Sequence, residues 1–589
     1  MLNVCGIIGI VSHKEQRASI VASCLRLLEY RGYDSVGIAA LDVGKVEVMK
    51  TVGGVEDLLK QVDVDSISSS VLVGHTRWAT HGMPTFSNAH PHTDCSSKIA
   101  VVHNGTITNF DVLKEELTSL GHRFKSETDT EVIPHMMEEW IKKGLTSWEA
   151  FKRTVQALNG SYAILAVVSG ERRIYFARKD NPLTIGLGKG SNYIASDAEA
   201  FVRFTRRVVR LMDGELGYIE ADEVRIFDFT GKEIAVGERV MEIGWSPEES
   251  GIIGYEHYML KEIQESPRAV RDTLAGIRFD QVSEAASLIR NSERVLVVGS
   301  GTSYHAGLLF GHLLEKEGYD VRTLIASEAT TLRPREGDVL ISISQSGETL
   351  DVLNAVKNHF KKYNIKSISL TNRIESALNF VSDIRLHTRA GPEVGVAATK
   401  TFTSQLAALL YLKSLIVGEP TDYLEGAPAA VSNSLSQQGY AKAIGEELCK
   451  KSDMFYLGRG MGVPLAMEGA LKIKEVAYIH AEAYPAGESK HGPIALISDG
   501  FPVFFVNDGE RTALLINNLK EMKARRAKTY SVSVNSRIGA DEEIYFEGDS
   551  SLAPFYISPF LQMVAYFAAV CKGANPDRPR NLAKTVTVE

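Results

Sequence analysis

The chain has 589 residues, which is more than one hydrophobic core supports and predicts several domains of about 100–200 residues each. Its composition, 44% hydrophobic and 23% charged, is ordinary for folded proteins and excludes a largely disordered chain. The formal net charge of −8 excludes the basic excess typical of nucleic-acid-binding proteins, so we expect no nucleic-acid partner.

The cysteines and the apolar stretches bear on where the protein works. Five cysteines, at positions 5, 24, 95, 449 and 571, form no C-x-x-C pair, and their number is odd. This argues against a disulfide framework and against a Cys-rich zinc site, and it fits a reducing cytoplasm. The most apolar stretch, FLQMVAYFAAV, is shorter than the about 18 residues of a membrane span and contains Gln562. We therefore predict a buried helix there and expect no membrane partner.

Residues 1–235 combine short β-rich runs with a few helices. Strands are predicted at 45–54, 98–107, 161–170 and 173–180, where β-forming residues are bounded by Gly, Asn or Asp. Helical periodicity appears at 19–29 and 131–143. We predict one domain at 1–235, and then a linker at 236–254 that leads into a helix from about Tyr255.

Strands and helices alternate after the linker. A strand, a Gly-rich turn and a helix are predicted in RVLVVGSGTSYHAGLLFGHLLEKEG, and again in DVLISISQSGETLDVLNAVKNHFKK. Such alternation predicts a parallel sheet with crossover helices. Because the order starts again near Gly439, we predict two doubly wound domains related by duplication, at 255–425 and 426–580, and a tail at 581–589.

Hydroxyl side chains gather at two turns of the second half. The first turn, Gly299–Ser303, is not a dinucleotide fingerprint, since Tyr304 stands where the third glycine belongs. The second, Ser344–Thr349, precedes a predicted helix. Hydroxyls and backbone N–H groups at the carboxyl ends of neighbouring parallel strands suit a phosphate monoester. The alternative is that these serines and threonines only cap helices.

Four further residues of the second half carry groups suited to acid–base chemistry. Lys472 and Glu475 are spaced i and i+3 on a predicted helix, where spacing alone favours a surface ion pair worth under about 1 kcal/mol. His491 is predicted in a loop, where exposed histidines are often functional. Lys584 lies in the tail, where a lysine is normally solvent-exposed. The pattern alone leaves structural and catalytic interpretations open.

Two patterns of the first half are also ambiguous. Asn104-Gly105 follows a predicted strand, so it indicates either a type I′ turn or an oxyanion hole formed by the Asn amide and the Gly N–H. His90-Pro91-His92 with Cys95 suggests metal ligands, but the spacing matches no familiar zinc pattern. We therefore expect no metal site.

Motifs along the whole chain resemble one enzyme family. Five N-terminal motifs resemble the glutaminase domain of class II glutamine amidotransferases: CGIIG, RGYDSVGIA, GHTRWATHG, HNGTITN and SETDTEVI. Five later segments resemble the sugar isomerase (SIS) domains of glucosamine-6-phosphate synthases: GTSYHAG, SQSGETLD, GVAATKTFTSQ, ALKIKEVAYIHAEAYPAGESKHGP and LAKTVTVE.

The resemblance implies an α/β and α+β multidomain fold. An N-terminal Ntn-hydrolase-type αββα sandwich is expected, followed by two doubly wound parallel-sheet SIS domains. The implied reaction takes fructose 6-phosphate and glutamine to glucosamine 6-phosphate and glutamate. The implied enzyme is a homodimer that uses no cofactor.

For the glutaminase domain, the resemblance implies that Cys5 attacks the glutamine amide, with its own α-amine as base. An α-amine titrates near about 8 and a thiol near about 8.5, so proton transfer between them costs little. Asn104 and Gly105 would hold the oxyanion. Trp78 would also gate the passage of ammonia. Glutamine would be bound by five residues: Arg77, Trp78, Thr80, His81 and Asp129.

For the SIS domains, the resemblance implies a phosphosugar site and four catalytic groups. Lys584 would form a Schiff base with the ketose carbonyl, which requires a neutral amine. Glu475, with Lys472 beside it, would move a proton between C1 and C2. His491 would help to open the sugar ring across a subunit boundary. The sugar phosphate would be bound by eight residues: Thr302, Ser303, Ser344, Gln345, Ser346, Thr349, Val396 and Ala583.

Three departures from the family pattern concern Ser300, Ala398 and the N-terminus. Relatives usually carry Cys and Ser at the first two positions, so we expect a changed sugar affinity at most. Met1–Val4 precede Cys5, whose nitrogen is then an amide and not a base. Three interpretations follow: a propeptide is cleaved, translation starts at Val4, or the extension persists and the glutaminase is silent.

Two rival functions follow from these ambiguities. With a silent glutaminase, the chain would be an ammonia-dependent phosphosugar isomerase or deaminase. A phosphosugar-binding regulator is the second rival. The acid–base residues argue against that rival, because binding alone needs no such groups.

Overall fold

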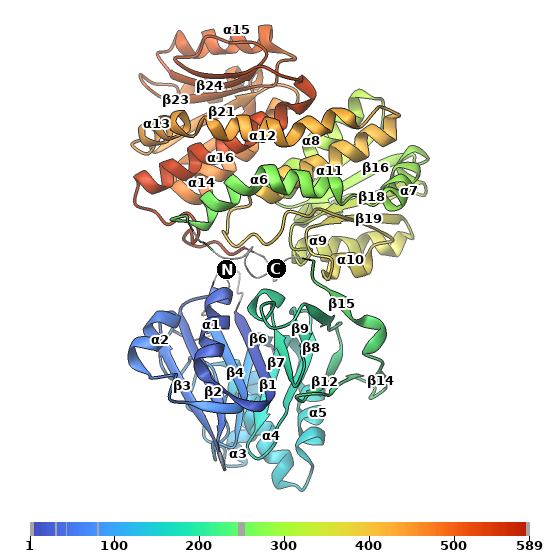
Figure 1. Cartoon of the computed structure of the whole chain (residues 1–589), viewed down its shortest axis with the longest axis vertical. Helices are drawn as coiled ribbons and strands as arrows, with labels where there is room; N and C mark the ends of the chain where they lie inside the picture. The colour runs from blue at the N-terminus through green and yellow to red at the C-terminus, as the bar shows by residue number, and fades with distance from the viewer. Residues whose placement is uncertain are drawn as a thin grey trace. The chain divides into compact units, whose positions relative to one another are not determined.

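The computed structural model describes residues 5–29, 32–42, 44–78, 82–244, 252 and 254–584. The chain divides into two compact units, and the boundary lies between Ser250 and Gly251. Unit 1 contains the strands and helices drawn in blue to green in Figure 1, and unit 2 contains those drawn in green to red.

Unit 1 contains two sheets whose described strands pair antiparallel. The eight-stranded sheet has the order β15 (Met241–Glu242), β11 (Arg207–Arg210), β9 (Thr184–Leu187), β10 (Ser191–Ala195), β1 (Gly6–Arg17), β4 (Ser68–Arg77), β2 (Ser35–Asp42), β3 (Lys45–Val52). The seven-stranded sheet has the order β14 (Glu233–Ile234), β13 (Val224–Asp228), β12 (Glu215–Ile219), β8 (Ile174–Lys179), β7 (Gly160–Val168), β6 (Ile99–Ile107), β5 (His92–Thr93). The helices are α1 (Ala18–Leu28), α2 (Val55–Gln61), α3 (Phe110–Ser119), α4 (Val132–Lys142) and α5 (Ser147–Ala157).

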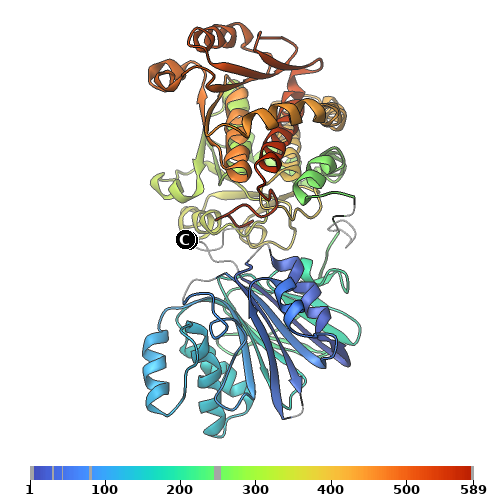
Figure 2. The same cartoon turned by 90° about the vertical axis from the view of Figure 1, so that its left-hand side faces the viewer.

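Apolar clusters separate the layers of unit 1. Along β1, Ile8 and Ile10 pack with α1, whereas Ile7 and Val11 belong to a cluster shared with the seven-stranded sheet. This alternation follows from the two-residue period of a strand. A further cluster joins the other face of the seven-stranded sheet to α3, α4 and α5. The resulting order of helix, sheet, sheet and helix (Figure 2) confirms the expected αββα sandwich.

Unit 2 contains two five-stranded sheets whose strands all pair parallel. The first has the order β17 (Val321–Ile325), β16 (Arg294–Gly299), β18 (Asp338–Ile343), β19 (Lys366–Thr371), β20 (Ile384–His387). The second has the order β22 (His480–Pro485), β21 (Asp453–Gly458), β23 (Pro502–Asn507), β24 (Lys528–Val534), β25 (Glu542–Phe546). In both sheets the strand that comes first in the chain lies between the second and the third, as expected for two doubly wound repeats.

Helices cover both faces of these sheets, and one apolar core is common to the two repeats. Phe310 and Leu406 of the first repeat and Leu465 and Phe560 of the second belong to that shared core. Each sheet has a smaller apolar cluster on its other face. The helices are α6 (Tyr258–Ala275), α7 (Phe279–Arg290), α8 (Thr302–Lys316), α9 (Leu350–Asn354), α10 (Ala377–Val381), α11 (Lys400–Val417), α12 (Ala427–Ser436), α13 (Gln438–Leu448), α14 (Gly462–Ala477), α15 (Thr512–Lys523) and α16 (Ala553–Cys571).

The apolar stretch FLQMVAYFAAV lies in α16, as predicted. By length and composition alone the helical stretch Ser550–Cys571 could cross a membrane, but 89% of its apolar window is buried inside the protein. Gln562 is fully buried within it and donates to the backbone oxygen of Thr399 at 3.2 Å. The stretch is therefore a core helix of unit 2.

Cys449 and Cys571 form a disulfide with an S–S distance of 2.15 Å, which the spacing of the cysteines did not indicate. Cys449 follows α13 and Cys571 ends α16, and these two helices pack against each other. The packing brings residues 122 positions apart to a Cα–Cα distance of 6.0 Å. Spacing in the sequence carried no sign of this contact, because it arises from helix packing.

Candidate functional sites

The thiol of Cys5 lies directly before β1, beside the end of the neighbouring strand β4. The backbone N–H of Trp78 donates to Cys5 Sγ at 3.3 Å, and the sulfur lies 3.7 Å from the Trp78 carbonyl oxygen. An N–H donor favours the thiolate, which is the nucleophilic form of cysteine. The Trp78 ring meets Tyr33 edge to face, with centroids 5.8 Å apart. Trp78 therefore contacts the expected nucleophile through its backbone.

Asn104 and Gly105 lie on β6, next to the backbone of Cys5. Asn104 Nδ2 donates to the Cys5 carbonyl oxygen at 2.7 Å. Gly105 has a φ of 121°, and a Cβ there would lie 2.0 Å from the Ser161 carbonyl oxygen, so only glycine fits. Both residues stay in the β6–β7 ladder. The type I′ turn interpretation is therefore wrong, and the side-chain amide of Asn104, one of the two donors expected for an oxyanion hole, contacts Cys5.

Arg77 and Asp129 supply opposite charges near Cys5. Arg77 ends β4 and is 3% exposed. Burial lowers the pKa of Arg77, while the charges of Cys5, Asp34 and Asp129 act in the opposite direction. The carboxylate of Asp129 accepts a hydrogen bond from the backbone N–H of Ile107 at 2.6 Å. This cation and this anion could hold the two charged ends of an amino acid.

Four buried histidines form a group that the motifs did not predict. The rings of His75 and His90 stack with centroids 4.1 Å apart, and those of His90 and His92 meet edge to face at 4.6 Å. His103 Nδ1 lies 2.8 Å from Thr130 Oγ1, in the turn that also carries Asp129. Burial lowers the pKa of every histidine in the group, to about 3 for His75, so all are neutral near neutral pH. The sequence feature that could have indicated this group is the presence of a histidine in or beside each of the strands β4, β5 and β6.

Not every residue expected at the glutaminase site can be placed. Thr80, His81 and Met1–Val4 lie outside the described residues. The structure brings together the other expected residues at adjoining ends of β1, β4 and β6 and at the turn before α4: Cys5, Arg77, Trp78, Asn104, Gly105 and Asp129.

The two hydroxyl-bearing turns of unit 2 lie at the switch point of the first parallel sheet. β16 pairs with β17 on one side and with β18 on the other, so the crossovers leave this point in opposite directions. Thr302 and Ser303 begin α8 after β16, and Ser344 directly follows β18. Neither α8 nor α9 has a side-chain hydrogen bond at its N-cap, so the interpretation as simple helix caps is wrong.

Hydroxyl groups organise the turn after β18. Ser344 Oγ lies 3.0 Å from Thr349 Oγ1 and accepts a hydrogen bond from the Gly347 N–H at 3.0 Å. Ser346 Oγ accepts one from the Glu348 N–H at 3.1 Å. Gln345, between these serines, is partly exposed. Hydroxyl oxygens and backbone N–H groups thus converge within a few residues, as a phosphate requires.

Lys472 lies in the interior and not on the surface. Its side chain is fully buried, and Nζ lies 2.6 Å from Glu475 Oε2, 3.4 Å from Glu468 Oε1 and 3.1 Å from Thr302 Oγ1. These partners match the three donors of an ammonium group. Glu468 also accepts from Thr302 at 3.0 Å and lies 2.7 Å from His305 Nδ1. The interpretation of Lys472 and Glu475 as a surface ion pair is therefore wrong, and α8 meets α14 at this network.

The electrostatics of this network set the protonation of Lys472 and Glu475. Burial acts to lower the pKa of Lys472, but Glu468 and Glu475 outweigh it and raise that pKa above its usual value. Burial raises the pKa of Glu475, and Lys472 acts in the opposite direction. A permanent cation thus lies beside a carboxyl whose pKa is moved toward the neutral range, which suits proton transfer.

The tail brings Lys584 to the same cluster. Lys584 Nζ donates to Glu393 Oε2 and, at 2.8 Å, to the carbonyl oxygen of Gly395, and its side chain is only 5% exposed. The charge of Lys584 acts to lower the pKa of Glu475, and the charge of Glu393 acts to raise the pKa of Lys472. The tail lysine is therefore not an ordinary solvent-exposed residue but a neighbour of the buried acid–base pair.

Glu393 is a candidate functional residue that no motif indicated. Its buried carboxylate accepts hydrogen bonds from the N–H of Thr399 at 2.8 Å and from the Thr401 hydroxyl at 2.7 Å. Burial acts to raise the pKa of Glu393, but Lys584 outweighs it and lowers that pKa. The one sequence signal was an acidic residue just before the GVAATK motif.

The remaining expected residues differ in their position. Val396 directly follows Gly395, whose carbonyl oxygen accepts the hydrogen bond from Lys584. The Val396 N–H donates to the Asp577 carbonyl oxygen at 3.3 Å. Ala583 precedes Lys584 and is partly exposed. His491 ends an exposed turn, and within the described part of the chain it makes no hydrogen bond or ion pair with the other expected catalytic groups.

Comparisons with known proteins cover the whole chain. A SIS domain model matches residues 288–414 and 447–570, and a glutamine amidotransferase domain model matches residues 75–203. The glutamine–fructose-6-phosphate aminotransferase [isomerizing] of Sulfurisphaera tokodaii is 54% identical over 591 residues, and 100% of each chain is covered. The protein of that name from Aquifex aeolicus is 41% identical over 601 residues, with 100% of each chain covered.

One solved structure matches the second half of the chain. The C-terminal domain of glucosamine-fructose-6-phosphate aminotransferase from Francisella tularensis is 35% identical, with a TM-score of 0.52. The match covers 56% of this chain and 100% of that chain.

Proposed function

The chain belongs to the family of isomerizing glutamine–fructose-6-phosphate aminotransferases, and from this premise we propose how its residues divide the reaction. The enzyme converts fructose 6-phosphate and glutamine to glucosamine 6-phosphate and glutamate. Ammonia must first be released from an amide and then be transferred to a ketose that becomes an aldose. The observation that carries the assignment of the second step is the buried pair of Lys472 and Glu475, with Lys584 and Glu393 near enough to act on its charges.

Unit 1 releases the ammonia. Cys5 Sγ attacks the amide carbon of glutamine and expels ammonia, and water then hydrolyses the resulting thioester to glutamate. Asn104 Nδ2 and the Gly105 N–H stabilise the oxyanion of the tetrahedral intermediate. Arg77 binds the substrate carboxylate and Asp129 the substrate ammonium. Their buried positions near Cys5 support these roles.

Unit 2 binds the sugar phosphate at the switch point of its first sheet. The hydroxyls of Thr302 and Ser303 and those of the Ser344–Thr349 turn hold the phosphate oxygens, together with backbone N–H groups of the turn. Gln345, Val396 and Ala583 line the sugar. The position of both turns after neighbouring parallel strands supports this assignment.

Lys584 and Glu475 carry out the chemistry on the sugar. Lys584 Nζ adds to C2 of the open ketose and water leaves, which gives an imine; ammonia then displaces the lysine nitrogen. Glu475 removes a proton from C1 and returns it to C2, while the C1 hydroxyl loses the proton that the nitrogen gains. The product is a 2-amino aldose. The Lys472 ammonium stabilises the negative charge that develops during this transfer.

Lys584 must lose a proton before it can react. Its ammonium form is held by Glu393 and the Gly395 carbonyl, so a bound sugar has to displace these contacts. We further propose that the enzyme works as a homodimer in the cytoplasm. The exposed position of His491, away from the other catalytic groups of its chain, supports a role in the partner's site.

The test measures glucosamine 6-phosphate formation with glutamine or with ammonium as the nitrogen donor. Cys5→Ala is expected to abolish the glutamine-dependent reaction and to retain the ammonium-dependent one. Lys584→Arg, which keeps the charge but cannot form an imine, is expected to abolish both. Lys572→Arg, an exposed lysine in the same C-terminal region, is the matched control and should retain both activities.

A direct readout complements the kinetics. Borohydride reduction in the presence of fructose 6-phosphate should attach one sugar phosphate to the peptide that contains Lys584, as detected by mass spectrometry. Full activity of Lys584→Arg, or attachment of the sugar at another lysine, would overturn the assignment.

A further inference from the structure

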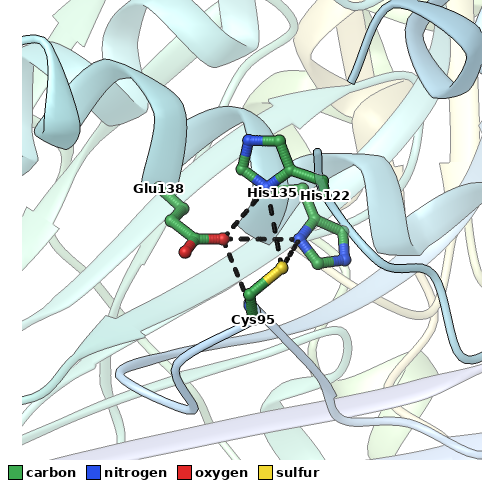
Figure 3. A group of neighbouring side chains, drawn as sticks. All are labelled: Cys95, His122, His135 and Glu138. Atoms are coloured by element: carbon green, nitrogen blue, oxygen red, sulfur yellow. Dashed lines mark hydrogen bonds and ion pairs between the residues drawn. The ribbon is translucent and has the colours of Figure 1, made fainter. Parts of the chain in front are cut away.

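Four side chains with metal-ligating atoms lie together beside α4 in unit 1. Figure 3 shows Cys95, His122, His135 and Glu138 pointing toward one another from three segments. His135 and Glu138 lie one turn apart on α4, His122 follows α3, and Cys95 lies between β5 and β6. His90 and His92, which the sequence grouped with Cys95, belong instead to the buried histidine group. We propose that this cluster is a structural zinc site.

The distances within the cluster fit a tetrahedral zinc ion. Zinc binds sulfur at about 2.3 Å and nitrogen or oxygen at about 2.0–2.2 Å, so the edges of its tetrahedron are about 3.3–3.7 Å. Cys95 Sγ lies 3.8 Å from His122 Nδ1 and 3.6 Å from His135 Nδ1. Glu138 Oε2 lies 3.1 Å from His122 Nδ1 and 3.5 Å from His135 Nδ1. All four atoms lie within 4.8 Å of one another.

The outer nitrogens of both histidines face carboxylates. His122 Nε2 lies 3.3 Å from Glu139 Oε2, and His135 Nε2 lies 3.6 Å from Glu131 Oε1. A ligating histidine usually donates its other ring N–H to such a carboxylate, which turns the lone pair of the inner nitrogen toward the metal. The Glu139 contact favours the tautomer in which the His122 Nδ1 lone pair points at the Glu138 oxygen and the Cys95 sulfur. His135 Nε2 is buried and makes no hydrogen bond in the described part of the chain. A cation at the centre of the cluster would relieve the repulsion between the nitrogen lone pair and the Glu138 carboxylate oxygen.

The two remaining ligands are also oriented by neighbours. Lys142 Nζ lies 2.9 Å from Glu138 Oε1, so only Oε2 faces the cluster. The Arg123 N–H donates to Cys95 Sγ at 3.5 Å, and the Cys95 N–H donates to Glu138 Oε2 at 3.1 Å. The cluster thus has an outer set of partners for each of its four ligands.

The chemistry of the ligands selects zinc and a structural role. One thiolate, two imidazoles and one carboxylate in a tetrahedral arrangement suit Zn²⁺ better than Mg²⁺ or Ca²⁺, which prefer oxygen ligands in larger number. Four protein ligands leave no open position for a substrate, as in structural sites. Both histidine side chains are only 1% exposed, whereas Cys95 is exposed and leaves a path for entry of the ion.

A bound ion would connect the zinc cluster to the glutaminase site. Glu131 faces His135 and belongs to the same turn, Asp129–Glu131, as Asp129. Its carboxylate also accepts hydrogen bonds from the N–H groups of Lys125 at 2.8 Å and Ser126 at 2.7 Å. Zinc would therefore hold α4 and the turn that carries Asp129 against the β5–β6 connection.

The test uses the full chain and Zn²⁺ itself. The protein is stripped with a chelator, incubated with Zn²⁺, desalted and analysed for metal by mass spectrometry. We expect one zinc per chain in the unmutated protein and a loss of at least about tenfold in Cys95→Ser and His135→Gln. His13→Gln, an exposed histidine of the same unit, is the matched control and should keep the full zinc content.

A second measurement avoids the risk that the variants fail to fold. In the unmutated protein, Zn²⁺ should protect Cys95 from alkylation, and Co²⁺ should give the visible absorption and thiolate charge-transfer bands of a tetrahedral site. Failure of the unmutated protein to retain zinc, or equal zinc content in Cys95→Ser and in the unmutated protein, would overturn the proposal. In that case the cluster would be a buried network of hydrogen bonds and ion pairs.

Discussion

Replacement of Lys472 by methionine should change both the stability of the enzyme and its pH dependence. Lys472 is fully buried, and its charge neutralises Glu475 at 2.6 Å and Glu468 at 3.4 Å. At an effective dielectric constant of about 20, the shorter contact alone supplies about 6 kcal/mol of gross attraction, part of which desolvation offsets. Loss of one partner of a buried pair leaves an uncompensated charge, so we expect a destabilisation of about 3–5 kcal/mol.

The same substitution should shift the pH profile of the sugar reaction. Glu475 must be a carboxylate to remove the C1 proton, and Lys472 lowers the pKa that burial raises. Without the lysine, that pKa should rise by about 1–3 units, and the acid limb of kcat/KM should move to higher pH by the same amount. At pH values below the shifted pKa of Glu475, each further pH unit lowers kcat/KM by about tenfold.

The assay follows glucosamine 6-phosphate formation with ammonium as the nitrogen donor, so that the glutaminase does not contribute. Stability is measured by urea denaturation at one pH. Lys474→Met is the matched control, because Lys474 lies on the same helix and is exposed. If Lys472→Met and Lys474→Met share the same pH profile and the same unfolding free energy, the proposed coupling of Lys472 to Glu475 is refuted.

Three further outcomes are expected. Gly105→Ala places a Cβ against the neighbouring strand and should lower the glutaminase rate by at least about 100-fold, with the ammonium-dependent rate unchanged, since one oxyanion donor moves away. Co-expression of Lys584→Ala and His491→Ala chains should restore about one quarter of the normal activity if His491 serves the partner's site, and none if it serves its own. The intact mass of the active protein should match a chain whose first residue is Cys5. Protein that retains Met1–Val4 should form product from ammonium but not from glutamine.

Local sequence patterns predicted strands and helices, the parallel sheets of the second half and several site residues, because they report on periodicity and on turns. The αββα layers of the first half were expected from the family resemblance. The strands and helices of both halves follow such patterns, and the hydroxyl-bearing turns lie where parallel alternation predicts them. Spacing also placed Lys472 and Glu475 on one helix face. Their burial could not be predicted, because it depends on α8, which is more than a hundred residues away in the chain.

Contacts between distant segments account for what the sequence did not predict. Glu393 meets Lys584 across 191 positions, and Cys449 meets Cys571 across 122. The ligands Cys95 and Glu138 come from a loop and a helix that no metal-binding motif connects. In each case the partners come from segments far apart in the chain, so the spacing of the residues did not indicate the contact.

The apolar core that spans both repeats of unit 2 has a consequence for evolution and for engineering. Phe310 and Leu406 pack in the same interior as Leu465 and Phe560, so neither repeat closes its own hydrophobic surface. A gene fragment that encodes only one repeat would produce a polypeptide with a large exposed apolar surface. Such a polypeptide would tend to aggregate or to pair with a second copy. A protein with a single repeat would thus need a second copy to cover that face, whereas this chain covers it within one polypeptide.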